Sequence, residues 1–105
     1  MMAERTYLLA IDASCGFEDI EKIRQYVTTS SDFSSWWNHL PMLFMLDSQM
    51  DSEAIAEKLH ALSPGARFLL TEVNLGAAQG WLPEVSWKWI EKRALSTTAQ
   101  HGMRV

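Results

Sequence analysis

The chain has 105 residues, a hydrophobic content of 48% and a net charge of −4, values typical of one modest globular domain and not of a disordered segment. Its single cysteine excludes an intrachain disulfide and fits a reducing cytoplasm, and no apolar run approaches the roughly 20 residues that cross a bilayer. The acidic balance argues against strong non-specific binding to nucleic acid, because such binding needs clustered cations. We therefore expect a cytoplasmic protein with no membrane partner.

The N-terminal segment predicts a buried strand followed by an amphipathic helix. Residues 6–12 are β-rich and nearly all apolar, which is typical of a central strand, and they end at Asp12. A turn that contains Gly16 leads into a predicted helix over 17–28. The apolar residues of this helix recur on one face at helical spacing: Phe17, Ile20, Ile23 and Val27.

The middle of the chain is uncharged from Phe33 to Leu46, and a stretch this apolar is expected inside the fold. One interpretation is a single long strand, which would give a parallel βαβαβ sheet. Pro41 opposes it, since proline cannot donate to the ladder of a central strand. We therefore predict an antiparallel pair, with a short strand over 36–39 and a second strand over 42–47.

The following segment again predicts a helix and then a strand. Asp51 or Ser52 can cap a helix that ends at the Ser-Pro-Gly sequence of residues 63–65. Residues 67–74 alternate well enough for a last core strand. The helical and strand periodicities together predict a core made of Leu8, Ala10, Phe17, Ile20, Ile23, Val27, Phe44, Leu46, Ile55, Leu59, Leu62, Phe68 and Leu70.

The element order is therefore β-α-β-β-α-β, which predicts an α+β, ferredoxin-like sandwich with one antiparallel sheet and both helices on one face. The other face would stay open or pack on a partner. Residues 75–80 form a link to a tryptophan-rich C-terminal segment, in which Pro83 suits the first turn of a helix. We expect a single domain over 1–95 and a polar C-terminal tail over 96–105.

The succession of these segments resembles that of a known group of proteins. The pattern consists of LLAID before a helix, WWNHLPMLFML after a polar loop, FLLTEV after a capped helix and GWLPEVSWKWI at the end. From about Thr6 to Trp89 the chain resembles short bacterial proteins that carry the label SinR-family. These proteins in turn resemble the small, ferredoxin-like CRISPR-associated proteins that accompany the integrase during spacer acquisition and are described as endonucleases.

The resemblance to the CRISPR-associated group implies a role for the acid that ends the first strand, here Asp12. In that group the acids of two chains face each other across a dimer axis and hold a divalent metal ion, which would make Asp12 a catalytic and metal-binding residue. Nucleic acid would then be the partner, although the net charge does not support it. The residues themselves favour a turn in which Asp12 binds the backbone of Ser14 or Cys15.

Five tryptophans are many for a chain of this length. Adjacent residues of a strand point to opposite faces, so Trp36 and Trp37 cannot both face the same core. Tryptophan is favoured at protein interfaces, and the open sheet face needs cover from the C-terminal segment or from a second chain. The predicted interface residues of a homodimer are therefore Trp36, Trp37, Trp81, Trp87 and Trp89.

Three functions stay open at this point. The favoured one is a non-catalytic interaction module without a cofactor, a homodimer joined through sheet faces or edges, because no residue set dictates a reaction. The second is a metal-dependent nuclease that uses Asp12 from both chains. The third is a small-ligand binder with a tryptophan-lined pocket between the sheet and the C-terminal helix.

Overall fold

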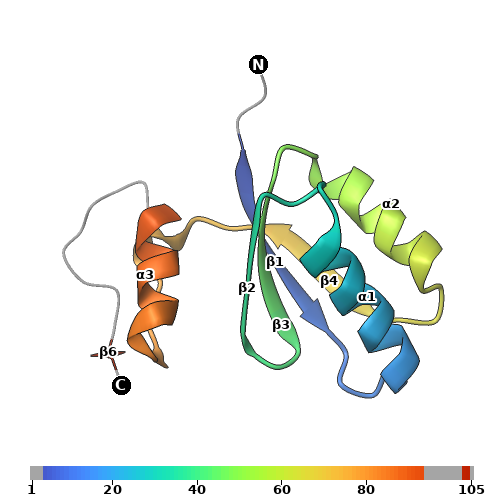
Figure 1. The fold of residues 1–105 in the computed structure, drawn as a ribbon, viewed down its shortest axis with the longest axis horizontal. Helices are drawn as coiled ribbons and strands as arrows, with labels where there is room; N and C mark the ends of the chain where they lie inside the picture. The colour runs from blue at the N-terminus through green and yellow to red at the C-terminus, as the bar shows by residue number, and fades with distance from the viewer. Residues whose placement is uncertain (1–3, 94–102, 105) are drawn as a thin grey trace. The chain divides into compact units, whose positions relative to one another are not determined.

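A four-stranded antiparallel sheet organises the first part of the chain (Figure 1). Its strands are β1 (Arg5–Ile11), β2 (Ser35–Leu40), β3 (Leu43–Ser48) and β4 (Phe68–Glu72), in the spatial order β2-β3-β1-β4. Helix α1 (Phe17–Thr29) joins β1 to β2, and helix α2 (Ser52–Leu62) joins β3 to β4. All neighbouring strands are antiparallel. This confirms the predicted ferredoxin-like βαββαβ topology.

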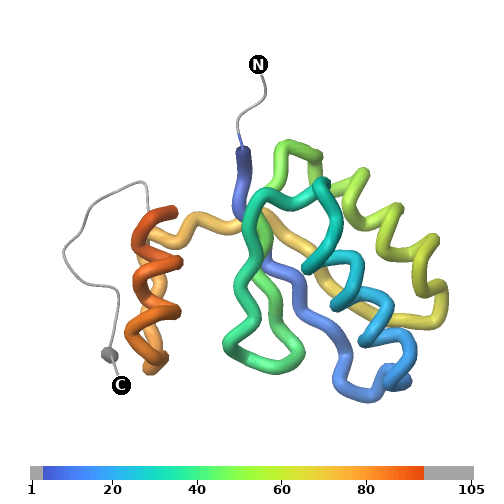
Figure 2. Tube along the Cα trace, viewed as in Figure 1, coloured from blue at the N-terminus to red at the C-terminus, as the bar shows by residue number. Residues whose placement is uncertain are grey.

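The computed structural model describes residues 4–93 and 103–104. The chain divides into two compact units, Met1–Glu72 and Val73–Val105. The first unit contains the whole sheet together with α1 and α2, which lie side by side on one face of it (Figure 2). No helix in the described part of the chain is long and apolar enough to cross a bilayer.

The core of the first unit lies between the sheet and the two helices. Its buried side chains are Tyr7, Leu9, Ile11, Ile23, Val27, Phe33, Phe44, Leu46, Ile55, Leu59 and Ala66. Ile20, Phe68 and Leu70 are partly buried against this cluster. Most of the predicted core is therefore confirmed, with corrections in β1 and at two helix ends.

The correction in β1 concerns which set of alternate side chains faces the helices. Leu8 and Ala10 were predicted in the core, but Tyr7, Leu9 and Ile11 occupy it. The strand is apolar on both faces, so its pattern does not distinguish them. Tyr7 can be fully buried because its hydroxyl donates a hydrogen bond to the Met50 carbonyl oxygen at 2.6 Å.

The other correction concerns the first residue of α1 and the last residue of α2. Phe17 is 77% exposed and Leu62 is 38% exposed, so the prediction that both belong to the core is wrong. Helical spacing identifies the face on which a side chain lies, but not whether the sheet extends far enough to cover it. The two helix ends are instead joined by a polar contact, in which the Ser63 hydroxyl donates to the Asp19 carboxylate.

Local signals in the sequence account for the helix start at α2 and for the hairpin. Asp51 caps α2, since its carboxylate accepts the Ala54 N–H at 2.8 Å. Pro41 lies in the turn between β2 and β3, as predicted. The amide of Asn38 closes this turn by donating to the carbonyl oxygens of Leu40 and Leu43, each at 2.9 Å.

The second unit is small and follows β4 directly. It contains the short 3-10 helix η1 (Leu75–Ala77), β5 (Trp81–Leu82), α3 (Glu84–Arg93) and β6 (Met103–Arg104), and β5 and β6 form a parallel pair. α3 packs against η1. Pro83 immediately precedes α3, and its carbonyl oxygen accepts the N–H groups of Ser86 and Trp87.

Two predicted boundaries have no outcome in the structure. The polar tail over 96–105 lies outside the described residues, apart from the two residues of β6. The expectation that residues 1–95 form a single domain stays a prediction.

Candidate functional site

Asp12 lies in the turn that follows β1, and both of its carboxylate oxygens accept hydrogen bonds. Oδ1 accepts the Ser14 N–H at 3.0 Å, as the turn interpretation predicted, and Oδ2 accepts from Nε of Arg67 at 3.0 Å. The hydrogen bonds from Ser14, assisted by the charge of the Arg67 guanidinium, hold the pKa of Asp12 below its usual value. Asp12 is therefore ionised at neutral pH, and its hydrogen bonds hold the start of the loop that joins β1 to α1.

Cys15 joins the same corner of the molecule to the residue that precedes β4. Its sulfur accepts the Arg67 N–H at 3.3 Å. Arg67 is thus bound through its backbone to Cys15 and through its side chain to Asp12. These contacts join the loop after β1 to the beginning of β4. We refer to Asp12, Ser14, Cys15 and Arg67 together as the Asp12 corner.

The metal-site hypothesis for Asp12 requires a second chain, so a single chain leaves it as a prediction. Within residues 4–93 and 103–104, no three His, Cys, Asp or Glu side chains gather closely enough to hold a metal ion.

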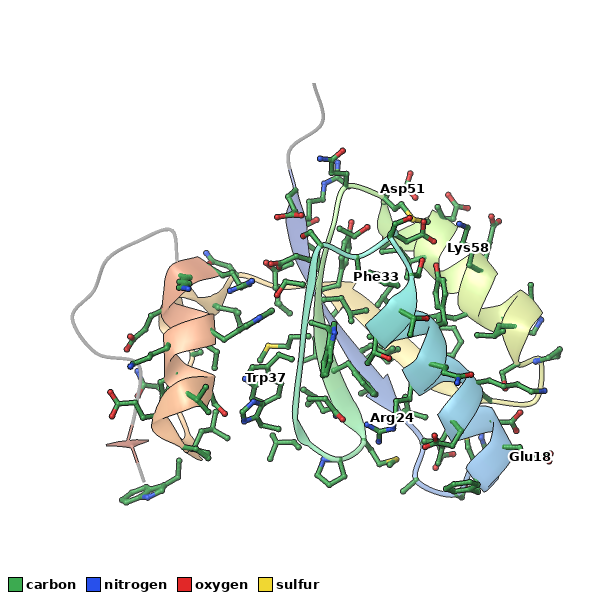
Figure 3. All side chains as sticks on the ribbon, viewed as in Figure 1. Glu18, Arg24, Phe33, Trp37, Asp51 and Lys58 are labelled. Atoms are coloured by element: carbon green, nitrogen blue, oxygen red, sulfur yellow. The ribbon has the colours of Figure 1, made fainter. Side chains whose placement is uncertain are left out.

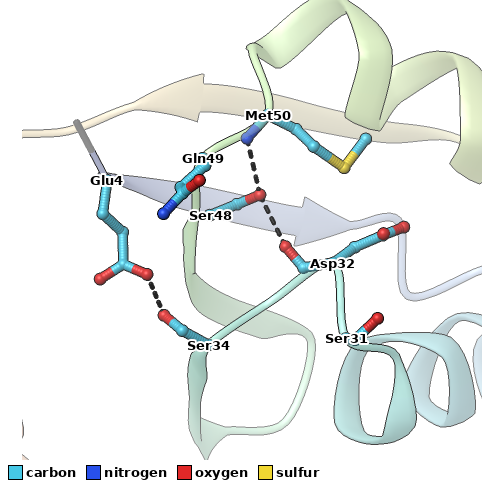
Figure 4. A pocket seen from close by; sticks show the side chains of 7 residues that line it. All are labelled: Glu4, Ser31, Asp32, Ser34, Ser48, Gln49 and Met50. Carbon is cyan, nitrogen blue, oxygen red and sulfur yellow. Dashed lines mark hydrogen bonds between the residues drawn. The ribbon is translucent and has the colours of Figure 1, made fainter. Parts of the chain in front are cut away.

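A polar pocket of about 330 Å³ lies where the α1–β2 loop meets the β3–α2 loop (Figure 4). Ser48 is its buried centre: its hydroxyl donates to the Asp32 carbonyl oxygen at 2.7 Å and accepts the Met50 N–H at 3.0 Å. At the rim the Ser34 hydroxyl donates to the Glu4 carboxylate. These polar groups bind one another and join the two loops, which is a structural role.

Asp32, which lines this pocket, also links α1 to α2. Its carboxylate accepts a hydrogen bond from the Tyr26 hydroxyl at 2.6 Å and forms an ion pair with Lys58 at 2.8 Å. The hydrogen bonds from Lys58 and Tyr26 lower the pKa of Asp32. Burial, reinforced by the hydrogen bond to Asp32, raises the pKa of Tyr26. The group therefore stabilises the fold with Asp32 charged and Tyr26 protonated.

The tryptophan pair of β2 points to opposite faces of the sheet, as predicted. Trp36 lies opposite Leu46 of the core face and is partly exposed, whereas Trp37 lies opposite Met45 on the other face and is buried. Trp37 stacks on His39, with ring centroids 5.2 Å apart. Figure 3 shows Trp37 on the side of the β2–β3 hairpin away from Arg24 of α1.

The three other tryptophans belong to the second unit. Trp81 of β5 is exposed and Trp87 of α3 is buried. The guanidinium of Arg93 lies over the Trp89 ring, 3.5 Å from its centroid. Of the predicted interface residues, Trp36 and Trp81 are thus the most available to a second chain. An interface role for any of the five stays a prediction.

The outer edge of β4 is a feature that the residue-by-residue interpretation missed. β4 pairs with β1 over its whole length without a register shift, and it is the last strand in the sheet order. The Arg67 carbonyl oxygen accepts the Asp12 N–H at 2.9 Å, so the backbone N–H and C=O groups of Arg67 point toward β1. Backbone groups alternate in direction along an antiparallel strand, so those of Phe68, Leu70 and Glu72 point away from the sheet.

Within the residues that the structure describes, this edge has no proline, lysine or bulge, three features that block strand addition. Proteins protect exposed edges with lysine, proline or a bulge, because unpaired backbone groups are a template for another strand. β4 has the sequence Phe-Leu-Leu-Thr-Glu, which contains neither proline nor lysine, and its central Leu69 is 63% exposed. The opposite edge, β2, is irregular because its register shifts between Trp37 and Leu40. The candidate site of the sheet is therefore the β4 edge.

A second depression, of about 350 Å³, lies where the end of β1 meets the start of β4. It is lined by Ala10, Ile11, Asp12, Arg67, Phe68 and Leu69. Neither this depression nor the polar pocket is lined by tryptophan. The tryptophan-lined ligand pocket gains no support from these two cavities.

Comparison with known proteins finds no matching family model, no matching curated protein and no matching solved structure. The class of protein is therefore defined by topology alone: a small α+β domain of the ferredoxin-like type. The resemblance to the SinR-family and CRISPR-associated groups stays a prediction. A fold by itself does not determine activity, so the β4 edge and the Asp12 corner are the features of this structure that bear on function.

Proposed function

We propose that the protein is a non-catalytic interaction module that works as a homodimer and that the β4 edge is its binding surface. The observation that carries this proposal is the exposed, unprotected edge strand with Leu69 at its centre. Strand addition needs backbone groups that point outward, and those of Phe68, Leu70 and Glu72 do so.

The chemistry of the Asp12 corner favours a role in binding over one in catalysis. Asp12 is held by Ser14 and Arg67, and the resulting low pKa makes it a poor general base at neutral pH. The hydrogen bonds of Ser48 in the polar pocket are likewise made within the fold. These groups support the loops around the sheet.

A second copy of the chain is a suitable partner because the edge strand combines apolar side chains with a polar one and a single charged one. Phe68 and Leu70 already pack against the core, and Glu72 at the strand end is the only charged residue of β4. A junction of two such short strands is small for a protein interface, so we expect a dissociation constant in the micromolar range.

The proposal is tested by sedimentation of the full chain over a range of concentrations, together with two matched variants. Leu69→Lys places a charge at the centre of β4, whereas Leu40→Lys makes the same change at a residue of the β2 edge that is 44% exposed. We expect the unmodified chain and Leu40→Lys to form dimers and Leu69→Lys to weaken dimerisation about tenfold or more, equivalent to at least roughly 1.4 kcal/mol.

Two outcomes would contradict this function. An unmodified chain that stays monomeric at all concentrations would remove the dimer. Equal weakening by Leu40→Lys and Leu69→Lys would show that the dimer does not use the β4 edge. Circular dichroism of both variants verifies that the fold is retained.

A further inference from the structure

We propose that β4 pairs antiparallel with β4 of a second copy in one particular register, with Leu69 directly opposite its own counterpart. The two four-stranded sheets would then form one continuous sheet across the dimer axis. This inference rests on the proposed dimeric function, and it specifies the geometry of that interface.

Symmetry restricts the registers that two identical strands can adopt. Two antiparallel edges in one continuous sheet are related by a two-fold axis perpendicular to the sheet, and this axis keeps each side chain on its own face. Residues directly opposite each other must also share a face. The axis therefore passes between the two copies of one residue, which lie directly opposite each other. Near the centre of β4 the residues that could lie at the axis are Phe68, Leu69 and Leu70.

The register centred on Leu69 is the one that matches apolar residues with apolar residues. Phe68 of one copy lies opposite Leu70 of the other, on the face where both already pack against the core. On the other face the two Leu69 side chains meet, and Arg67 lies opposite Thr71. The exposed side chain of Leu69 is covered, and Glu72 lies opposite Ala66, beyond the last residues of the two strands that pair.

The register centred on Leu70 is less favourable because of the charge at the end of the strand. It would place the Glu72 carboxylate opposite Phe68, which packs against the apolar core. Desolvation of the Glu72 carboxylate against the Phe68 ring outweighs the additional backbone contacts at the strand end.

The register centred on Phe68 fails for a different reason. It would place Leu70 opposite Ala66, whose N–H already donates to the Ser63 carbonyl oxygen at 3.0 Å. It would also place Leu69 opposite Arg67, which forms the ion pair with Asp12.

Backbone geometry is consistent with the register centred on Leu69. The outward N–H and C=O groups of Phe68 in one copy face those of Leu70 in the other, so all of these groups find partners. Leu69 directs its own backbone groups toward β1, which makes the central pair a non-hydrogen-bonded one. Such pairs have Cα atoms roughly 4.5 Å apart, close enough for a disulfide between cysteines placed there.

Cysteine crosslinking of the full chain tests this register. Each variant carries Cys15→Ser, in which the serine hydroxyl can still accept the Arg67 N–H, so that the introduced cysteine is the only thiol. Leu69→Cys is compared with Thr71→Cys, an exposed position on the same face of the same strand. Diamide takes two electrons and two protons from a pair of thiols to form a disulfide, and a non-reducing gel then shows the product.

We expect Leu69→Cys to give a covalent dimer and Thr71→Cys to remain a single chain. In the proposed register the two Thr71 Cα atoms are about 14 Å apart, which is too far for a disulfide. Leu70→Cys serves as the indicator of the alternative register.

The outcomes separate this inference from the proposed function. A dimer in sedimentation that crosslinks through Leu70→Cys or Thr71→Cys, and not through Leu69→Cys, would overturn the register and leave the dimer standing. A chain that is monomeric in sedimentation and crosslinks at none of the three positions would overturn both.

Discussion

Replacing Leu59 by alanine is expected to destabilise the first unit strongly, because this side chain lies in the middle of α2 and is fully buried in the core. The substitution removes three carbons from the apolar interior, at roughly 0.8 kcal/mol each, or roughly 2.4 kcal/mol in all. The cavity that remains adds to this loss, and we expect a total of about 2–5 kcal/mol in the free energy of unfolding.

Leu62→Ala is the matched control for this experiment. It makes the same chemical change one turn further along α2, at a residue that is 38% exposed, and we expect a loss below about 1 kcal/mol. Urea denaturation followed by tryptophan fluorescence measures both variants against the unmodified chain. Similar losses for the two variants, or a loss below about 1 kcal/mol for Leu59→Ala, would refute the assignment of the core.

Three further predictions concern a helix cap, acid stability and catalysis. Asp51→Ala removes the acceptor of the Ala54 N–H and is expected to cost about 1 kcal/mol in urea denaturation, whereas Asp51→Asn keeps an acceptor and should cost less. Lys58 lowers the folded-state pKa of Asp32 relative to the usual value of 3.8, so the stability that this carboxylate contributes is present above that value and is lost as the pH falls below it. Asp32→Asn should therefore flatten the acid limb of a stability–pH curve, and an unchanged limb would show that the ion pair with Lys58 does not contribute. Purified protein with magnesium or manganese should leave single- and double-stranded DNA and RNA intact, and cleavage that disappears in Asp12→Ala would establish the nuclease alternative.

Local sequence signals were sufficient for the order of the main elements. The helical face of Ile23 and Val27, the cap at Asp51 and the break at Pro41 each act within a few residues of the chain. Turn and capping preferences depend on short-range sterics and hydrogen bonds, so they can be inferred from neighbouring residues alone. The ferredoxin-like topology followed from these elements, and the contact between Asp12 and the Ser14 N–H was predicted in the same way.

Tertiary contacts decided which side of each element is buried. β1 is apolar on both faces, and only its position under α1 and α2 places Tyr7 and not Leu8 in the core. Phe17 and Leu62 fit the helical pattern, yet each lies at a helix end where the core does not cover it. A periodic pattern shows on which face of a helix a side chain lies. It does not show how far the sheet that packs against this face extends.

The candidate site shows the same division between local and long-range information. That Asp12 ends a strand and forms a turn is a property of five neighbouring residues, 11–15, whereas its ion pair with Arg67 joins residues far apart in the chain. The open edge depends on the strand order β2-β3-β1-β4, which gives β4 a single neighbouring strand among the described residues. The sequence by itself therefore determined the helices and strands of the βαββαβ domain, the cap of α2 and the turn at Pro41, because these depend on adjacent residues, whereas η1, β5 and β6 were not predicted. Only the tertiary structure decided which strand has an unpaired side, because strand order is set by the packing of distant segments.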